Sequence, residues 1–281
     1  MFSVVQNLME PKTQKELAFI QDLYIATDWG ERFAELVDEH IKLPKKGRAL
    51  YLEAGTGSHA LALRERGGAN LTIVCADQNE DCLELARAKA VALHERAEFK
   101  HEDLQALSFA DEQFDLVLAN NSLIAPANIG NSLIEAVRVA KTGATVAWWL
   151  PTASSFGEFF SIYWEALLNA GVADHGAEVE HLITELPTVS DAERWSEEAG
   201  LVSVTSFTAK EEFDYASGSE FLKSPLITDF LLPNWLQSIP EDVHQKVRDE
   251  LAHVIDEDRH AGEFALTVKA TLIVGKKGRM R

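Results

Sequence analysis

The chain has 281 residues, of which 46% are hydrophobic, and it carries a formal net charge of −19. This size supports one large α/β domain with a sizeable core, and two cysteines give neither a disulfide framework nor a metal-site spacing. The negative field would repel a phosphate backbone, so nucleic acid is not expected as a partner.

The start of the chain and its hydropathy suggest where the protein resides. Residues 1–6 lack a basic region followed by an apolar core of about 7–15 residues, so we expect no secretory signal. No apolar run reaches the length of about 18 residues that a membrane span needs. We therefore expect a cytoplasmic protein with no membrane partner.

The first segment of the chain is helical in pattern. Apolar residues recur at helical spacing through 12–42, and Pro44 and Gly47 then interrupt the pattern. We assign 1–47 to an N-terminal helical segment.

From residue 48 onward, apolar strands alternate with helical patterns. Strands are predicted at 49–54, 71–76, 115–119 and 144–150, and helices at 59–66, 79–94 and 129–140. Strands that alternate with helices predict a parallel sheet covered by helices on both faces.

Two further helices are predicted after this alternation. A strongly aromatic helix begins near Phe156 and stops at Gly171. A capping box of Ser190 and Glu193 predicts the start of the second helix, which ends at Gly200.

The last part of the chain contains two strands and an insertion. Residues 201–208 and 264–274 alternate apolar and polar side chains, which predicts a strand in each. The segment between them has no strand pattern, so we predict a helical insertion or lid at 214–262. The domain that binds a cofactor then covers 48–213, and 263–281 supplies the final strand and a basic tail.

A glycine turn is the most informative motif. Gly55-Thr56-Gly57 follows a strand and precedes a helix, so the turn can adopt positive φ, and a ligand can approach the backbone closely. Asp77 ends the next strand, 20 positions after Gly57, where a carboxylate can accept hydrogen bonds from a ribose diol. The pattern predicts a nucleoside site, and a purely structural glycine turn is the alternative.

With these pieces in order, the chain resembles the class I S-adenosylmethionine-dependent methyltransferases of the small-molecule type, with an insertion before the last strand. The resemblance runs from about residue 48 to 151 and more loosely to 275. The segments that look like the family's first four motifs are, in order, Glu53-x-Gly55-x-Gly57, Asp77-Gln78, Glu102-Asp103-Leu104 and 114–120.

The resemblance implies a doubly wound, mostly parallel seven-stranded sheet with an antiparallel last strand. It implies methyl transfer from S-adenosyl-L-methionine to a small-molecule acceptor, with S-adenosyl-L-homocysteine as the product. Glu53 would bind the amino group of the cofactor, Asp77 the ribose hydroxyls and Asp103 the adenine amino group. The implied cofactor contacts are Glu53, Gly55, Thr56, Gly57, Asp77, Gln78, Asp103, Leu104 and Asn120.

The acceptor side of the site is less defined. His59 stands where the family usually has a third glycine, and we expect it to face solvent from the helix start, with ligand contact as the alternative. No general base is evident, so no catalytic residue is assigned. Residues expected to line an apolar or aromatic acceptor pocket, with a core role as the alternative, are Tyr24, Trp29, Asn121, Phe159, Tyr163, Phe221 and Trp235.

Two other functions stay open. An NAD-dependent oxidoreductase shares the pattern Gly55-x-Gly57-x-x-Ala60, but the charge of Glu53 in the same turn would repel a bound pyrophosphate. A non-catalytic methyltransferase-like binding protein would keep the cofactor site without turnover.

Overall fold

The computed structural model describes residues 12–279 except 173, 175, 259–261 and 263. Within this part of the chain, seven strands form one sheet in the order β3-β2-β1-β4-β5-β7-β6. The strands are β1 (Gly47–Leu52), β2 (Leu71–Asp77), β3 (Ala97–His101), β4 (Phe114–Asn120), β5 (Ala140–Pro151), β6 (Leu201–Tyr215) and β7 (Phe264–Lys277). The first five strands pair in parallel, and β7 is antiparallel to both β5 and β6. The predicted fold class is confirmed.

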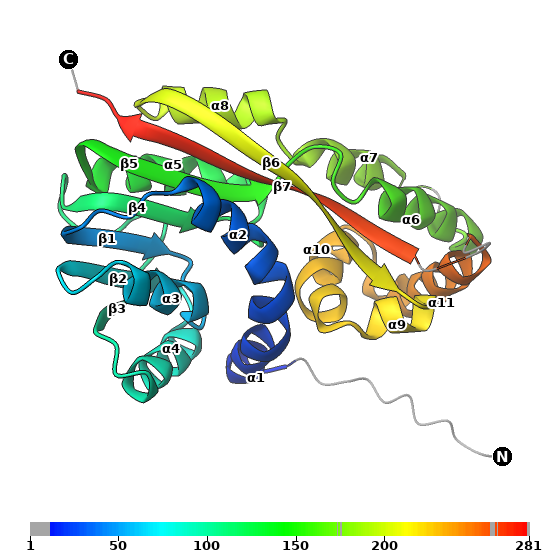
Figure 1. Cartoon of the computed structure of the whole chain (residues 1–281). Helices are drawn as coiled ribbons and strands as arrows, with labels where there is room; N and C mark the ends of the chain where they lie inside the picture. Colours follow the sequence, from blue (N-terminus) through cyan, green and yellow to red (C-terminus); the bar gives the residue numbers. More distant parts are fainter. Residues whose placement is uncertain (1–11, 173, 175, 259–261, 263, 280–281) are drawn as a thin grey trace.

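Helices lie on both faces of this sheet (Figure 1). The N-terminal segment contains α1 (Gln14–Ile20), the π-helix η1 (Gln21–Trp29) and α2 (Gly30–His40). The helices that follow are α3 (Ser58–Arg66), α4 (Glu80–Ala92), α5 (Pro126–Val139), α6 (Gly157–Ala170), α7 (Gly176–Glu185) and α8 (Val189–Glu198). Before the last strand come α9 (Gly218–Lys223), η3 (Leu226–Leu231), α10 (Leu232–Leu236) and α11 (Glu241–Asp258). None of the helices in the described ranges is both long and apolar enough to cross a membrane.

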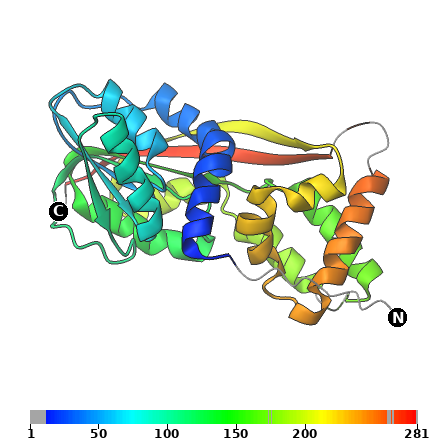
Figure 2. The same ribbon diagram turned by 90° about the horizontal axis from the view of Figure 1, so that it is seen from below.

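The last two strands extend beyond the rest of the sheet (Figure 2). The ladder between β6 and β7 continues to Tyr215 opposite Phe264, whereas β5 ends with Pro151 opposite Ala270. The extended pair therefore carries the helices α9 to α11 away from the parallel strands. The N-terminal helices lie between these two parts of the molecule (Figures 1 and 2).

Two local features differ from the sequence expectation. β3 and α7 were not predicted, and the exposed or half-buried side chains of β3 explain why it lacks the apolar run of a buried strand.

The capping box of α8 is formed by Thr188 and Asp191, two residues before the predicted pair. The Thr188 hydroxyl oxygen accepts from the Asp191 N–H at 3.1 Å, and the Asp191 carboxylate accepts from the Thr188 N–H at 3.1 Å.

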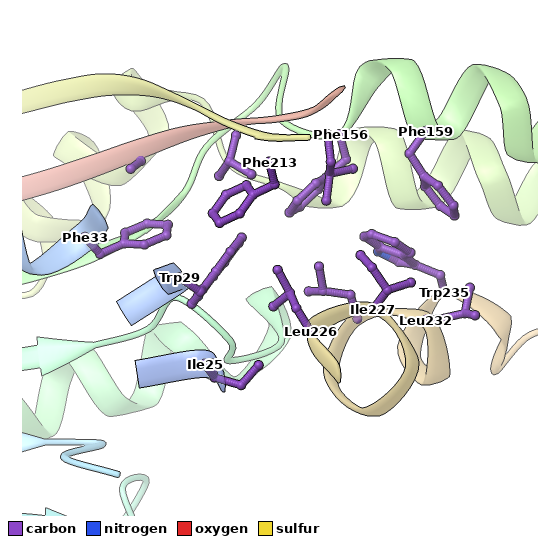
Figure 3. Close-up of a cluster of buried hydrophobic side chains, with 14 of the residues drawn as sticks. Ile25, Trp29, Phe33, Phe156, Phe159, Phe213, Leu226, Ile227, Leu232 and Trp235 are labelled. Atoms are coloured by element: carbon purple, nitrogen blue, oxygen red, sulfur yellow. The ribbon is translucent and has the colours of Figure 1, made fainter. Parts of the chain in front are cut away.

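An aromatic cluster joins the N-terminal helices, the sheet and the insertion (Figure 3). Trp29 of η1 lies 5.5 Å from Phe213 of β6 and 5.0 Å from Phe33 of α2, measured between ring centroids. Toward the insertion, Trp235 of α10 stacks on Phe159 of α6 at 4.2 Å. Because these rings are buried, their packing fixes the N-terminal segment between the sheet and the insertion.

Four residues expected in the acceptor pocket belong to this core. Phe159, Tyr163 and Phe221 are almost completely buried, and Trp235 is 7% exposed. The Tyr163 hydroxyl donates to the backbone carbonyl of Trp235 at 3.0 Å. The two side chains of α6, Phe159 and Tyr163, pack against Phe221 and Trp235 of the insertion, so all four fill the core instead of lining the cavity described below.

We expect Trp235→Ala to lower the free energy of unfolding by about 3–5 kcal/mol, because it removes a large buried ring from a packed cluster. Tyr24→Ala, at a side chain that is 56% exposed, should change it by less than about 0.5 kcal/mol. Denaturant unfolding followed by circular dichroism measures both. Equal and small losses would show that the insertion core is not packed as described.

Candidate functional site

The candidate site lies where the strand order reverses. β1 pairs in parallel with β2 on one side and with β4 on the other, and ligands of such sheets bind in the crevice outside the carboxyl ends at this point. Glu53 follows β1, Asp77 ends β2 and Asn120 ends β4, so all three are brought to one edge. A cavity of about 370 Å³ opens there.

The glycine turn has the backbone conformation that its sequence predicts. Gly55 and Gly57 have φ of +54° and +78°, in the left-handed region that favours glycine. A Cβ on Gly57 would lie 2.8 Å from the Cβ of Ala86 on α4, and one on Gly55 would lie 2.7 Å from Nε2 of Gln21 on η1. The turn is therefore packed from both sides: at Gly57 the fixed Cβ of Ala86 leaves no room for a side chain, whereas at Gly55 the flexible end of Gln21 would have to move.

Asp77 holds this turn in place. Its carboxylate is buried, and it accepts hydrogen bonds from the Gly55 N–H at 2.7 Å and the Asn79 N–H at 2.8 Å. Burial raises the pKa of Asp77, and these hydrogen bonds act in the opposite direction. Each carboxylate oxygen keeps a lone pair beyond these bonds, but Asp77 is 3% exposed and does not belong to the lining of the 370 Å³ cavity.

Glu53 is the most perturbed acid at the cavity. It has φ of +51°, which is uncommon outside glycine, and its carboxylate accepts from Nε2 of Gln78 at 3.0 Å. Burial and the negative charge of Asp77 raise the pKa of Glu53 to about 8, although the Gln78 hydrogen bond lowers it. A positively charged ligand group placed here would favour the ionised carboxylate.

The loop after β3 lies beside the same edge. The Glu102 N–H donates to the Asp77 carbonyl at 3.0 Å, which places this loop next to the second strand. Asp103 is exposed, and its carboxylate accepts from the Gln105 N–H at 2.9 Å. Leu104 is buried in the core below. Neither residue belongs to the lining of the 370 Å³ cavity.

Residues after β4 and residues of η1 form the opposite side of the cavity. Asn120 lines it and accepts from the Ser122 N–H at 3.1 Å, whereas Asn121 is buried and does not belong to the lining. Trp29, 1% exposed, donates from Nε1 to the Ser122 hydroxyl at 3.1 Å and lines the cavity as well. Tyr24 is exposed instead and lines a second cavity of about 410 Å³ that it shares with Trp29.

The π-helix η1 is fastened to the glycine turn, which the sequence did not indicate. The Thr56 hydroxyl donates to the Asp22 carboxylate at 2.5 Å, and Lys89 of α4 forms an ion pair with Asp22. Lys89 also donates to the Ser58 hydroxyl at 2.7 Å. These contacts connect η1, the turn and α4 above the candidate site, and π-helical turns are frequent at functional sites.

His59 does not face solvent, so that expectation is wrong. Its side chain is 16% exposed, with Nδ1 2.9 Å from the Tyr51 hydroxyl and Nε2 3.0 Å from the Asp38 carboxylate. Burial raises the pKa of Asp38, but hydrogen bonds from His59 and Arg66 outweigh it and hold the pKa at about 2. The one signal in the sequence was the histidine in place of a third glycine.

Comparison with known proteins agrees with this geometry. The family model described as a methyltransferase domain matches residues 49–143. Residues 49–143 form a methyltransferase domain. A demethylmenaquinone methyltransferase of Clavibacter sepedonicus is 30% identical over 166 residues, which cover 56% of this chain. A protein of the same name from Thermus thermophilus is 34% identical over 144 residues, which cover 50% of this chain.

The fold of most of the chain is similar to that of solved structures. The YcgJ protein of Bacillus subtilis has a TM-score of 0.58 at 16% identity and covers 89% of this chain and 100% of its own. Phosphoethanolamine N-methyltransferase 2 of Haemonchus contortus, in complex with S-adenosylhomocysteine, has a TM-score of 0.54 at 13% identity and covers 94% of this chain and 58% of its own. The chain has the class I methyltransferase fold. It spans 66% and 63% of the length of the two curated relatives named above.

We expect Gly57→Ala to lower the free energy of unfolding by about 2–4 kcal/mol, because it combines a left-handed backbone with a clash against Ala86. Gly130→Ala, in the exposed part of α5 with open space around it, is the matched control. It should raise the free energy of unfolding by about 0.5–1 kcal/mol. Similar effects of both changes in thermal unfolding would contradict the packed turn.

Proposed function

We propose that this protein transfers a methyl group from S-adenosylmethionine to a small-molecule acceptor. The observation that carries the proposal is that Glu53 lines the cavity beside a glycine turn that the neighbouring acid Asp77 anchors. Two neighbouring acids with raised pKa favour a ligand that brings a positive charge, and the α-amino group of this cofactor is such a charge.

The residues of the site fit the cofactor. Glu53 is positioned to bind the amino group, and Asp77 retains lone pairs for the ribose hydroxyls. The loop with Asp103 and Leu104 borders Asp77, where the adenine would lie. When bound, the cofactor supplies an activated methyl group. The protein then contributes alignment of the acceptor and exclusion of water.

The acceptor side favours an apolar or aromatic small molecule. Trp29, Tyr51 and Trp149 contribute aromatic rings to the cavity, and Ser122 and Asn120 contribute polar groups. The curated relatives named as demethylmenaquinone methyltransferases support a small-molecule acceptor. The net charge of −19 argues against nucleic acid.

A nicotinamide dinucleotide fits the site less well. Its pyrophosphate would bring further negative charge to the glycine turn, beside Asp77 and the ionisable carboxyl of Glu53. Lys89, which donates to the Thr56 hydroxyl of the turn at 3.2 Å, already pairs with Asp22.

A calorimetric titration with S-adenosylmethionine tests the proposal. Because the pKa of Glu53 is about 8 without ligand, its carboxyl is mostly protonated at pH 7, and binding an ammonium group must displace that proton. We expect release of about one proton per cofactor bound, seen as a dependence of the binding enthalpy on the ionisation enthalpy of the buffer. Affinity should accordingly rise as the pH is raised from 6 to 8.

Glu53→Gln should abolish this proton release and weaken binding by about 10–100-fold, the value of one hydrogen bond to a charged group. Glu80→Gln, at an exposed residue of α4, is the control and should bind like the wild type. Binding of NADH but not S-adenosylmethionine would favour the oxidoreductase. Cofactor binding without transfer of a labelled methyl group to small molecules of a cell extract would leave the non-catalytic alternative.

A further inference from the structure

Three hydrogen-bonded side chains line the cavity in addition to the residues of the glycine turn. Tyr51 of β1, His59 of α3 and Asp38 of α2 are linked in that order by contacts of 2.9 and 3.0 Å. All three residues line the same cavity as the turn and Asn120. The cofactor contacts proposed above use none of them.

The protons in this chain can be assigned from the charges. Asp38 is ionised at neutral pH because its pKa is about 2, so Nε2 of His59 carries the hydrogen that it donates to Asp38. In the neutral ring Nδ1 is then an acceptor, and the Tyr51 hydroxyl donates to it. Burial raises the pKa of Tyr51 far above its usual value, so the phenol stays protonated.

With the protons assigned in this way, the Tyr51 oxygen is the atom that can accept a hydrogen bond from a ligand. Both ring nitrogens of His59 are engaged, whereas the Tyr51 oxygen donates one hydrogen bond and keeps its lone pairs. The Tyr51 ring is held edge-on to Trp149, with ring centroids 5.6 Å apart and planes at 80°. A ligand hydroxyl in the cavity can therefore donate to Tyr51 while Tyr51 donates to His59.

We propose that the chain of Tyr51, His59 and Asp38 takes the proton of a hydroxyl acceptor during methyl transfer, with Tyr51 as the residue that touches the acceptor. The inference rests on the proposed function and narrows its acceptor to a hydroxyl compound. Hydroxyl groups such as phenols, with pKa near 10, hold their proton at neutral pH, so their methylation requires a base. His59 and Asp38 are positioning residues that act through Tyr51.

The transfer balances within these groups. The acceptor oxygen forms a bond to the methyl carbon as the carbon–sulfur bond of the donor breaks and its electron pair stays on sulfur. The acceptor proton moves to the Tyr51 oxygen, and the Tyr51 proton moves to Nδ1 of His59. One positive charge disappears from the donor sulfur, and one appears on the His59 ring beside Asp38.

Acidic side chains of α2 line the cavity together with His59. Asp38 is ionised and is kept in place by an ion pair with Arg66, whose charge it balances. Glu31 and Glu35 of α2 line the same cavity and add negative charge to it. The charge of an imidazolium is therefore compensated from α2, while Tyr51 on the strand side contributes no charge.

Binding of 4-nitrophenol, whose phenolate absorbs visible light, tests the inference without turnover. The protein is saturated with S-adenosylhomocysteine, which has no methyl group to give. We expect the wild type to bind the probe about tenfold more ionised than it is in free solution at the same pH, a shift of about one pKa unit. His59→Gln, which keeps hydrogen-bonding groups but cannot take a proton, should abolish this increase. His94→Asn, at an exposed histidine outside the cavity, should leave it unchanged.

Tyr51→Phe is a second variant that interrupts the proton transfer, in case His59→Gln does not fold. It should also abolish the increase in the ionised fraction of the bound probe. S-adenosylhomocysteine binding is measured by calorimetry in the same samples. If it binds, and the probe is equally ionised in the wild type and both variants or produces no change in absorbance, the proton-accepting chain is refuted and the proposed function stands. If S-adenosylhomocysteine does not bind to the wild type, the proposed function itself fails.

Discussion

The anchoring of one glycine turn by a buried carboxylate is the interaction on which the rest of the site depends. Asp77 joins the Gly55 N–H to the start of α4, and Gly57 is in close contact with the same helix. From the other side, η1 covers the turn through Gln21 and Asp22. The turn can keep its left-handed backbone because three separate elements hold it, and the cavity opens beside it.

The cavity is lined by two chemically different groups of side chains. At the turn, burial and the negative charge of Asp77 raise the pKa of Glu53, and burial raises the pKa of Asp77, which favours a ligand that brings a positive charge. Along α2 and α3, an ionised Asp38 orients His59 and leaves Tyr51 ready to accept a proton. A cationic methyl donor and a protonated acceptor need these two environments side by side, since the reaction moves a positive charge from one toward the other.

The sequence predicted the features that depend on local backbone requirements. The glycine turn between strand and helix, with an acid at the end of the next strand, needs particular residues at fixed positions, so the positive φ of Gly55 and Gly57 and the place of Asp77 at the end of β2 followed from the sequence, whereas the hydrogen bond from the Gly55 N–H to Asp77 did not. Side-chain partners were harder to predict. Helical spacing shows that Phe159 and Trp235 lie on a buried face, but it does not show that the insertion covers that face. The hydrogen bonds from Tyr51 to His59 and from His59 to Asp38 could not be predicted for the same reason, because these residues come from three elements that only tertiary packing brings together.

A crystal structure of the protein with S-adenosylhomocysteine tests the central claim most directly. The account predicts density for the ligand over Gly55 and Gly57, with its amino group within hydrogen-bond distance of Glu53 and its ribose hydroxyls against Asp77. The turn itself should keep its conformation, because Asp77 already holds it without the ligand. Density for the nucleoside elsewhere, or Glu53 and Asp77 directed away from it, would contradict the account.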